Sequence, residues 1–167
     1  EAHYNLGVTL EGLDQLDEAL KSYEQAIDIK PDYAEAYYNL GGILEELGRL
    51  DDAVRSLEKA IEIKPDYAEA HNNLGNAFKD LGQLDAAVKS YEQAIDIKPD
   101  YAEAHYNLGS VLKELGQLDD AVKSYEQAIE IKPDFAEAHN NLGIALNELG
   151  QLDAAVKSYN QALAIKP

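Results

Sequence analysis

Five prolines recur every 34 residues through this chain of 167 residues, and most other positions repeat with them. They are Pro31, Pro65, Pro99, Pro133 and Pro167. Self-similarity with a period of about 20 to 50 residues is the sequence signature of a stacked repeat protein. The period leaves no room for a second domain. We therefore expect a single array over residues 1–167, with repeats at 1–33, 34–67, 68–101, 102–135 and 136–167.

Each repeat has the apolar spacing of two amphipathic helices joined by a short turn. In the second repeat, Gly48 separates the two apolar stripes and Pro65 follows the second one. The stripe of the first helix consists of Tyr37, Leu40, Gly41, Leu44 and Leu47, and that of the second consists of Leu50, Ala53, Val54, Leu57, Ala60 and Ile61. Because proline cannot donate an interior backbone hydrogen bond, Pro65 ends the second helix. The spacing predicts an all-α protein.

Three local features predict how the helices begin and pack. Asp32 and Glu35 have the spacing of a capping box at the start of the first helix. Gly41 lies in mid-helix, where glycine costs about 1 kcal/mol relative to alanine, so we expect another helix to approach its backbone closely. An aromatic residue stands at each junction between repeats, and we expect this series to seal the interfaces: Tyr33, Tyr67, Tyr101 and Phe135.

The residues that recur in register resemble the tetratricopeptide repeat. A Leu-Gly pair recurs in each first helix, at Leu6-Gly7, Leu40-Gly41, Leu74-Gly75, Leu108-Gly109 and Leu142-Gly143. A large residue recurs in each second helix, at Tyr23, Leu57, Tyr91, Tyr125 and Tyr159. The resemblance covers the whole chain and implies a right-handed α-solenoid of stacked helix–turn–helix repeats with about ten helices. Asp14 replaces the turn glycine in the first repeat.

The charge of the chain limits its partners. Net charge is −18, from 32 acidic and 14 basic residues. Nucleic-acid phosphates and anionic membrane surfaces are bound through Lys and Arg, so we expect neither partner. No window is apolar enough for a transmembrane helix and no signal peptide precedes the first repeat, which favours a cytoplasmic location. The chain has no methionine and begins inside a repeat, which indicates a fragment of a longer array.

No arrangement of residues predicts catalysis, a metal site or a cofactor. The four histidines, spaced by multiples of 34 residues, fall on the apolar stripes of different repeats, which favours packing. Serines such as Ser22, Ser90 and Ser124 are expected on the polar side of the second helices, without a histidine partner. There is no cysteine and no glycine-rich phosphate loop. We expect the protein not to be an enzyme.

The first helices carry a second stripe, which the core does not use. In a stacked array such stripes line up as a groove. An asparagine recurs on it in every repeat, at Asn5, Asn39, Asn73, Asn107 and Asn141. The preceding positions hold Tyr4, Tyr38, Asn72, Tyr106 and Asn140. An amide both donates and accepts, so these asparagines either hold the backbone of an extended peptide or bond to neighbouring helices and fix the register of the stack. Tyrosine adds apolar area with a polar tip.

Family resemblance implies a role for this groove. A similar asparagine ladder lines the superhelical arm of the protein O-GlcNAc transferases, where it contacts peptide backbone. The basic clamp that some tetratricopeptide domains use for a C-terminal carboxylate is absent, because glutamate takes the place of lysine at Glu1, Glu35, Glu69, Glu103 and Glu137. The first-helix halves of the repeats hold 16 acidic and two basic residues. We therefore expect a cationic or non-acidic protein or peptide as the partner.

Three function hypotheses follow. The first is a scaffold that binds an extended or helical peptide in the groove. The second is the substrate-presenting arm of a larger enzyme, such as a glycosyltransferase or a sulfotransferase. In the third, the chain associates head to tail through uncapped ends, with Leu152, Val156, Tyr159 and Leu163 exposed on the last helix. The identical stretches at 21–36 and 89–104 indicate either recent duplication or an engineered consensus array.

Overall fold

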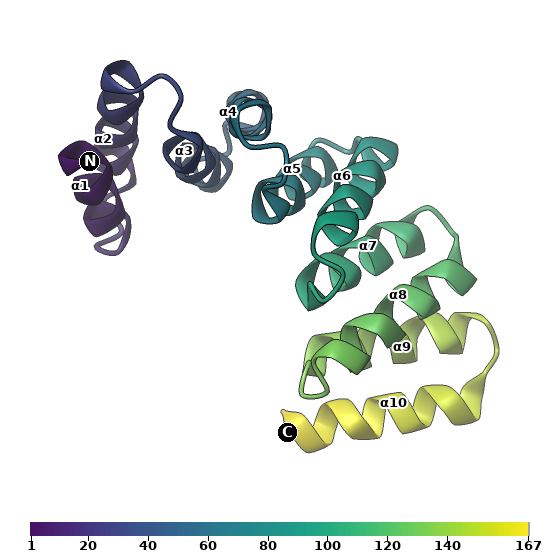
Figure 1. The fold of residues 1–167 in the computed structure, drawn as a ribbon. Helices are drawn as coiled ribbons and strands as arrows, with labels where there is room; N and C mark the ends of the chain where they lie inside the picture. The colour runs from purple at the N-terminus through teal and green to yellow at the C-terminus, as the bar shows by residue number, and fades with distance from the viewer. Residues whose placement is uncertain (167) are drawn as a thin grey trace. The chain divides into compact units, whose positions relative to one another are not determined.

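A computed structural model describes residues 1–166, and these residues form ten α-helices and no strand (Figure 1). Pro167, the last proline of the period, lies outside the described residues. The helices are α1 (Ala2–Glu11), α2 (Leu16–Ile29), α3 (Ala34–Glu46), α4 (Leu50–Ile63), α5 (Ala68–Asp80), α6 (Leu84–Ile97), α7 (Ala102–Glu114), α8 (Leu118–Ile131), α9 (Ala136–Glu148) and α10 (Leu152–Ile165). Each predicted repeat is a pair of helices, as the apolar spacing indicated.

The helices end where the turn residues predict. Gly48, between α3 and α4, has φ of +70°, which glycine adopts without a steric penalty. Asp14, the residue that replaces this glycine in the first repeat, has φ of +59° and adopts the same left-handed conformation. Helix α4 ends at Ile63, two residues before Pro65. The turn residue thus marks the end of the first helix of a repeat, and the proline follows the end of the second helix.

The predicted capping box does not form. Helix α3 begins at Ala34 with Tyr33 as its N-cap residue, and no side chain caps it. Asp32 lies one residue before the N-cap position, so its side chain does not cap the helix. The reason is that the N-cap position belongs to the junction aromatic, whose ring lies 4.9 Å from the ring of Tyr4. Packing between repeats has displaced the polar cap.

Glycine in the first helices permits the close packing that its position predicted. A methyl group on Gly41 would lie 2.6 Å from Cγ of Leu57, and one on Gly7 would lie 2.6 Å from the ring of Tyr23. Such distances are well below van der Waals contact. In these two repeats the large residue of the second helix therefore rests directly on the backbone of the first helix, and the expectation for Gly41 is confirmed.

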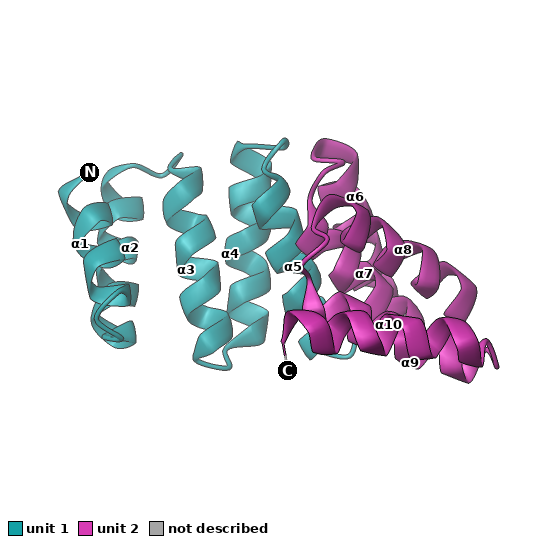
Figure 2. Cartoon of the chain, turned by 90° about the horizontal axis from the view of Figure 1, so that it is seen from below, with its two compact units in different colours: residues 1–83 teal, residues 84–167 magenta. Residues whose placement is uncertain are grey.

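The structure divides into two compact units, Glu1–Gln83 and Leu84–Pro167 (Figure 2). The division falls between the two helices of the third repeat. Unit 1 contains α1 to α5, with a core around Tyr23, Leu40 and Ile43. Unit 2 contains α6 to α10, and its core surrounds Tyr125 and Leu142. Each unit buries its own apolar stripes.

The junction aromatics pack against aromatic residues of the first helices, as expected of residues that seal the interfaces between repeats. The ring of Tyr67 lies 4.9 Å from Tyr38, and that of Phe135 lies 4.8 Å from Tyr106. A lysine at the end of the second helix covers each junction ring at 4.4 to 4.7 Å, in a cation–π arrangement. The junctions at Tyr33, Tyr67 and Phe135 thus each join an aromatic pair to one lysine.

The serines of the second helices are buried, so their predicted placement on the polar side is wrong. The Oγ atoms of Ser22, Ser90 and Ser124 donate to the carbonyl four residues earlier. Ser56 instead donates to the carbonyl oxygen of Tyr37 at 2.8 Å. A serine hydroxyl that bonds to the backbone of its own helix can be buried at little cost, which is why apolar periodicity alone misplaced these residues.

Candidate functional site

The predicted asparagine and tyrosine series lies on the first helix of each repeat. We call this surface the first-helix face. In unit 1 it includes Tyr4 and Asn5 on α1, Tyr38 and Asn39 on α3, and Asn72 and Asn73 on α5. In unit 2 it includes Tyr106 and Asn107 on α7, and Asn140 and Asn141 on α9. Asn5 and Asn140 are exposed, and the other residues are half-buried except Asn72, which is buried.

In unit 1 the amide of Asn39 links the first two repeats. Its Nδ2 donates to the hydroxyl oxygens of Tyr4 at 3.3 Å and Tyr23 at 3.2 Å. The hydroxyl of Tyr23 in turn donates to Oε2 of Glu11 at 2.7 Å. Burial, and then the bond to Glu11, raise the pKa of Tyr23, so this hydroxyl stays protonated and remains a donor.

The same contact recurs between the second and third repeats and between the fourth and fifth. Burial raises the pKa of Tyr38, and a hydrogen bond with Asn73 partly offsets that shift. In unit 2, Nδ2 of Asn141 donates to the hydroxyl of Tyr106 at 3.1 Å. Nδ2 of Asn140 donates to Oδ1 of Asn141 at 3.4 Å. An asparagine of one repeat therefore holds the tyrosine of the repeat before it.

These contacts give the register-holding interpretation a physical basis in both units. The amides that pair with tyrosine are already partly satisfied, so a ligand would have to share or displace these bonds. Asn5 and Asn140 are exposed to solvent, and Asn140 also donates to Asn141. Binding of a peptide by the asparagines stays a prediction.

Each unit has a hollow that is lined in part by residues of its first-helix face. The hollow of unit 1, about 510 Å³, is lined by Tyr4, Val8, Glu11, Gly12, Asp14, Leu16, Asn39 and Glu46. That of unit 2, about 520 Å³, is lined by Tyr106, Ala136, Glu137, Asn140, Asn141, Tyr159, Ala162, Leu163 and Lys166. Both contain a tyrosine and an asparagine of the predicted series.

The two hollows differ in charge. Three carboxylates line the hollow of unit 1, and no lysine or arginine does. In unit 2 the single carboxylate, Glu137, forms an ion pair with Lys166 at 3.6 Å, and apolar side chains make up much of the wall. The hollow of unit 1 is therefore the more acidic of the two.

One carboxyl on this face of unit 1 titrates abnormally. Burial raises the pKa of Glu45 from its ordinary value near 4.5 to about 7. Repulsion from Asp80 and Glu46 adds to the effect, and Lys79 reduces it. The sequence contained no signal for this titration, because the shift depends on burial and on the approach of α5 to α3.

Three histidines have a role that the sequence did not reveal. A ring nitrogen, Nε2, of His71 lies 3.1 Å from the carbonyl oxygen of Pro65. His105 and His139 make the same contact with Pro99 and Pro133, at 3.0 Å each. Each of these histidines therefore makes a hydrogen bond to the junction in addition to its predicted packing role.

Among the described residues, no three His, Cys, Asp or Glu side chains are grouped as metal ligands would be.

The apolar stripe predicted on the last helix is exposed for three of its four residues. Leu152, Val156 and Leu163 of α10 are 58 to 60% exposed, and Tyr159 is half-buried.

Within the range that the structure describes, no helix is long and apolar enough to span a membrane.

Comparison with known proteins identifies the repeats. A family model described as TPR repeat matches residues 13–48, 43–82, 75–116 and 109–150, and one described as tetratricopeptide repeat matches residues 136–167. The chain belongs to the tetratricopeptide repeat family. A search of the curated proteins found no match.

Several solved tetratricopeptide repeat structures have the same fold. A crystal structure of MamA is 32% identical over 96% of this chain and 94% of that one, with a TM-score of 0.89. A thermophilic TPR protein of Thermus thermophilus is 29% identical over 99% of this chain and 91% of that one, with a TM-score of 0.78. YrrB, described as a TPR protein with an unusual peptide-binding site, is 24% identical over 99% of this chain and 85% of that one, with a TM-score of 0.80. The all-α solenoid prediction is confirmed.

Proposed function

We propose that this protein is a non-catalytic scaffold whose first-helix face binds an extended or helical segment of a partner protein. One observation carries the proposal: in each unit the predicted tyrosine and asparagine positions line an open hollow large enough for side chains of a ligand. Tyrosine supplies rigid apolar area and a polar tip, which suits it to binding surfaces. Stacked helical repeats use such faces to bind partners.

The charge of the unit 1 hollow favours a basic residue in the bound segment. Glu11, Asp14 and Glu46 line this hollow together with Tyr4. A Lys or Arg side chain would gain both carboxylate contacts and a cation–π contact with the ring. Electrostatic attraction of this kind speeds association and weakens as salt is added.

Selection of peptides tests the proposal. Dodecamers selected from a random phage library against the protein should be enriched in Lys and Arg. Their affinity should fall by about tenfold in Glu46→Gln, because one charge-assisted contact is lost. Asp28→Asn serves as the matched control, since Asp28 is an exposed carboxylate of α2 outside the hollow. Selected peptides that bind Glu46→Gln, Asn5→Ala and Asn140→Ala as tightly as the parent would show that the first-helix face is not their site.

The exposed leucines of α10 favour a second proposal, that copies of the chain associate through this helix. Burying an exposed leucine side chain contributes about 1.5 to 3 kcal/mol, and Leu152, Val156 and Leu163 are all available. Sedimentation velocity over a wide range of concentration should show association in the parent chain and its loss in Leu163→Glu. A parent chain that sediments as a monomer at every concentration contradicts this proposal.

A further inference from the structure

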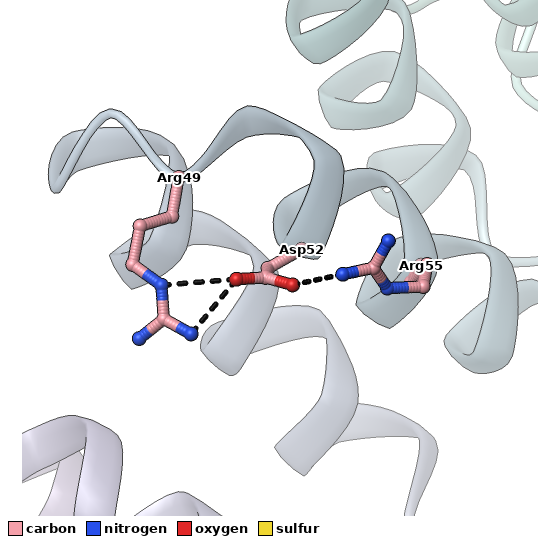
Figure 3. A network of polar contacts seen from close by, with 3 residues as sticks. All are labelled: Arg49, Asp52 and Arg55. Carbon is pink, nitrogen blue, oxygen red and sulfur yellow. Dashed lines mark hydrogen bonds and ion pairs between the residues drawn. The ribbon is translucent and has the colours of Figure 1, made fainter.

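The two arginines of the chain lie together in the second repeat, away from the hollow of the first-helix face. Arg49 is the N-cap residue of α4, and Arg55 lies in that helix. Both pair with Asp52, which stands between them (Figure 3). Nε and Nη2 of Arg49 donate to Oδ2 of Asp52 at 3.0 and 2.8 Å, and Nη2 of Arg55 donates to Oδ1.

These residues form the wall of a hollow of about 380 Å³ in unit 1, which we call the arginine hollow. Its lining comes from three helices: Glu24 of α2, Tyr37, Leu40 and Leu44 of α3, and Arg49, Asp52, Arg55, Ser56 and Lys59 at the start of α4 and within it. The two leucines are buried and form an apolar floor. The hollow shares no residue with that of the first-helix face.

Unit 2 contains an equivalent hollow with different chemistry. It is lined by residues at the same repeat positions, including Glu126, His139, Leu142, Leu146, Gln151, Ala154, Lys157, Ser158 and Gln161. Its floor is again two leucines. In its wall, however, Gln151, Ala154, Lys157 and Gln161 take the places of Arg49, Asp52, Arg55 and Lys59. The packing of the repeats produces the hollow, whereas the two arginines are particular to the second repeat.

The arrangement suits a carboxylate. Asp52 takes two N–H donors of Arg49 and one of Arg55, so each planar guanidinium is held in place with further donors directed away from Asp52. Guanidinium binds carboxylate through two parallel hydrogen bonds, which lysine cannot do. Lys59 forms an ion pair with Glu62 at 2.8 Å, and Glu24 is the remaining carboxylate of the lining. Anion binding therefore falls to the arginines.

We propose that the arginine hollow is a second interaction site, which binds an acidic segment of a partner protein. A carboxylate side chain of that segment pairs with Arg49 and Arg55, and an adjacent apolar side chain packs on Leu40 and Leu44. In a chain whose net charge is −18, three cations and two carboxylates line this hollow, so its preference is opposite to that of the hollow of unit 1, which has three carboxylates and no lysine or arginine. The site does not depend on binding at the first-helix face.

The small number of arginines makes a direct test simple. Protein labelled with ¹⁵N only in arginine gives two side-chain Nε–Hε signals, and both belong to the proposed site. Addition of the synthetic peptide GELELEG should shift both signals until they saturate. The neutral peptide GQLQLQG is the matched control and should leave them in place. Signals that stay in place with GELELEG, or that move equally with GQLQLQG, overturn the proposal.

Variants that copy unit 2 provide the second test. The variant Arg49→Gln, Asp52→Ala, Arg55→Lys and Lys59→Gln gives the arginine hollow the wall residues of unit 2, which the third repeat also has at Gln83, Ala86, Lys89 and Gln93. Fluorescence anisotropy of labelled GELELEG should show binding weaker by about tenfold. Arg55→Lys alone, which keeps the charge and loses the planar donor pair, should also weaken it and covers the case in which the multiple variant folds poorly. Unchanged affinity in Arg55→Lys and in a folded multiple variant contradicts the proposal.

Inorganic phosphate distinguishes a peptide site from a general anion site. At equal concentration and at about 0.15 M ionic strength, phosphate should move the two arginine signals less than GELELEG does, because it gains nothing from the leucine floor. Equal or larger shifts with phosphate would mean that the hollow binds small anions, and the proposal of an acidic protein segment would fall.

Discussion

Two adjacent glycines of α3 have opposite surroundings. A Cβ on Gly41 would lie 2.6 Å from Leu57, whereas nothing lies within 4 Å of one on Gly42. Gly41→Ala should lower the free energy of unfolding by about 1 to 3 kcal/mol, because overpacking outweighs the gain in helix propensity. Gly42→Ala should raise it by up to about 1 kcal/mol. Urea denaturation measures both. A destabilising Gly42→Ala, or a neutral Gly41→Ala, would contradict the packing described for this helix.

Glu45 makes stability depend on pH. Its pKa is raised from near 4.5 to about 7, so the native protein holds this proton more tightly than the unfolded chain does. The contribution of Glu45 to stability is therefore complete below about pH 4.5 and is lost as the pH rises through about 7. Glu45→Gln should stabilise the protein at pH values above 7, by less than about 1.4 kcal/mol per pKa unit because the side chain is partly exposed.

Denaturation of the two proteins across this pH range measures the difference. Glu58→Gln, at an exposed position of α4, removes the same formal charge and serves as the control. If the stability difference between Glu45→Gln and the parent is the same at low and at neutral pH, then Glu45 is not the group responsible.

At the scale of helices, Asn39 joins α3 to α1 and α2. Asn39→Ala removes donors from the hydroxyls of Tyr4 and Tyr23, so it should lower the free energy of unfolding by about 1 to 2 kcal/mol. Asn5→Ala, at the exposed equivalent on α1, should be close to neutral. Thermal melts of both variants measure the register role separately from any ligand. A melt of Asn39→Ala equal to that of the parent would show that the hydrogen bonds contribute nothing to the stack.

The helices themselves were predictable because apolar spacing, turn glycines and prolines act locally. The packing roles of Gly41 and of the junction aromatics could also be predicted, since only packing explains a glycine in mid-helix or an aromatic at every repeat boundary. The capping box at Asp32 was wrong because contacts between repeats claimed the N-cap position for Tyr33. The burial of the serines could not be predicted from the repeat spacing. The same is true of the hydrogen bonds from His71, His105 and His139 to proline carbonyls, because they depend on distances in the folded structure.

At the scale of the whole molecule, the net charge of −18 opposes folding through self-repulsion. Added NaCl should therefore raise the melting temperature by a few degrees, with most of the rise complete below about 0.5 M as screening saturates. Differential scanning calorimetry measures this. KCl should give the same curve, because screening depends on ionic strength rather than on the cation. A melting temperature that does not change with salt would mean that repulsion contributes little.

The candidate sites differ in how well they could be predicted from the sequence. The face that carries Tyr4 and Asn39 follows from helical spacing, because every repeat presents it in the same way. The hollow of Arg49 and Arg55 requires side chains from three helices to meet, and the bond from Asn39 to Tyr4 requires the register between repeats. The division into two units within the third repeat has no counterpart in the period of 34 residues.

Buried tyrosines of the second helices also give the protein intrinsic spectroscopic probes. Tyr23, Tyr91 and Tyr125 are fully buried, and the chain contains no tryptophan whose emission would mask theirs. They lie in the first, third and fourth repeats, whereas Leu57 leaves the second repeat without such a chromophore. Tyr23→Leu would remove the buried reporter of unit 1, whose core cluster includes Tyr23, while Tyr91 and Tyr125 remain in unit 2. The difference in near-ultraviolet circular dichroism between the parent and Tyr23→Leu then reports on the core of unit 1 without an attached label.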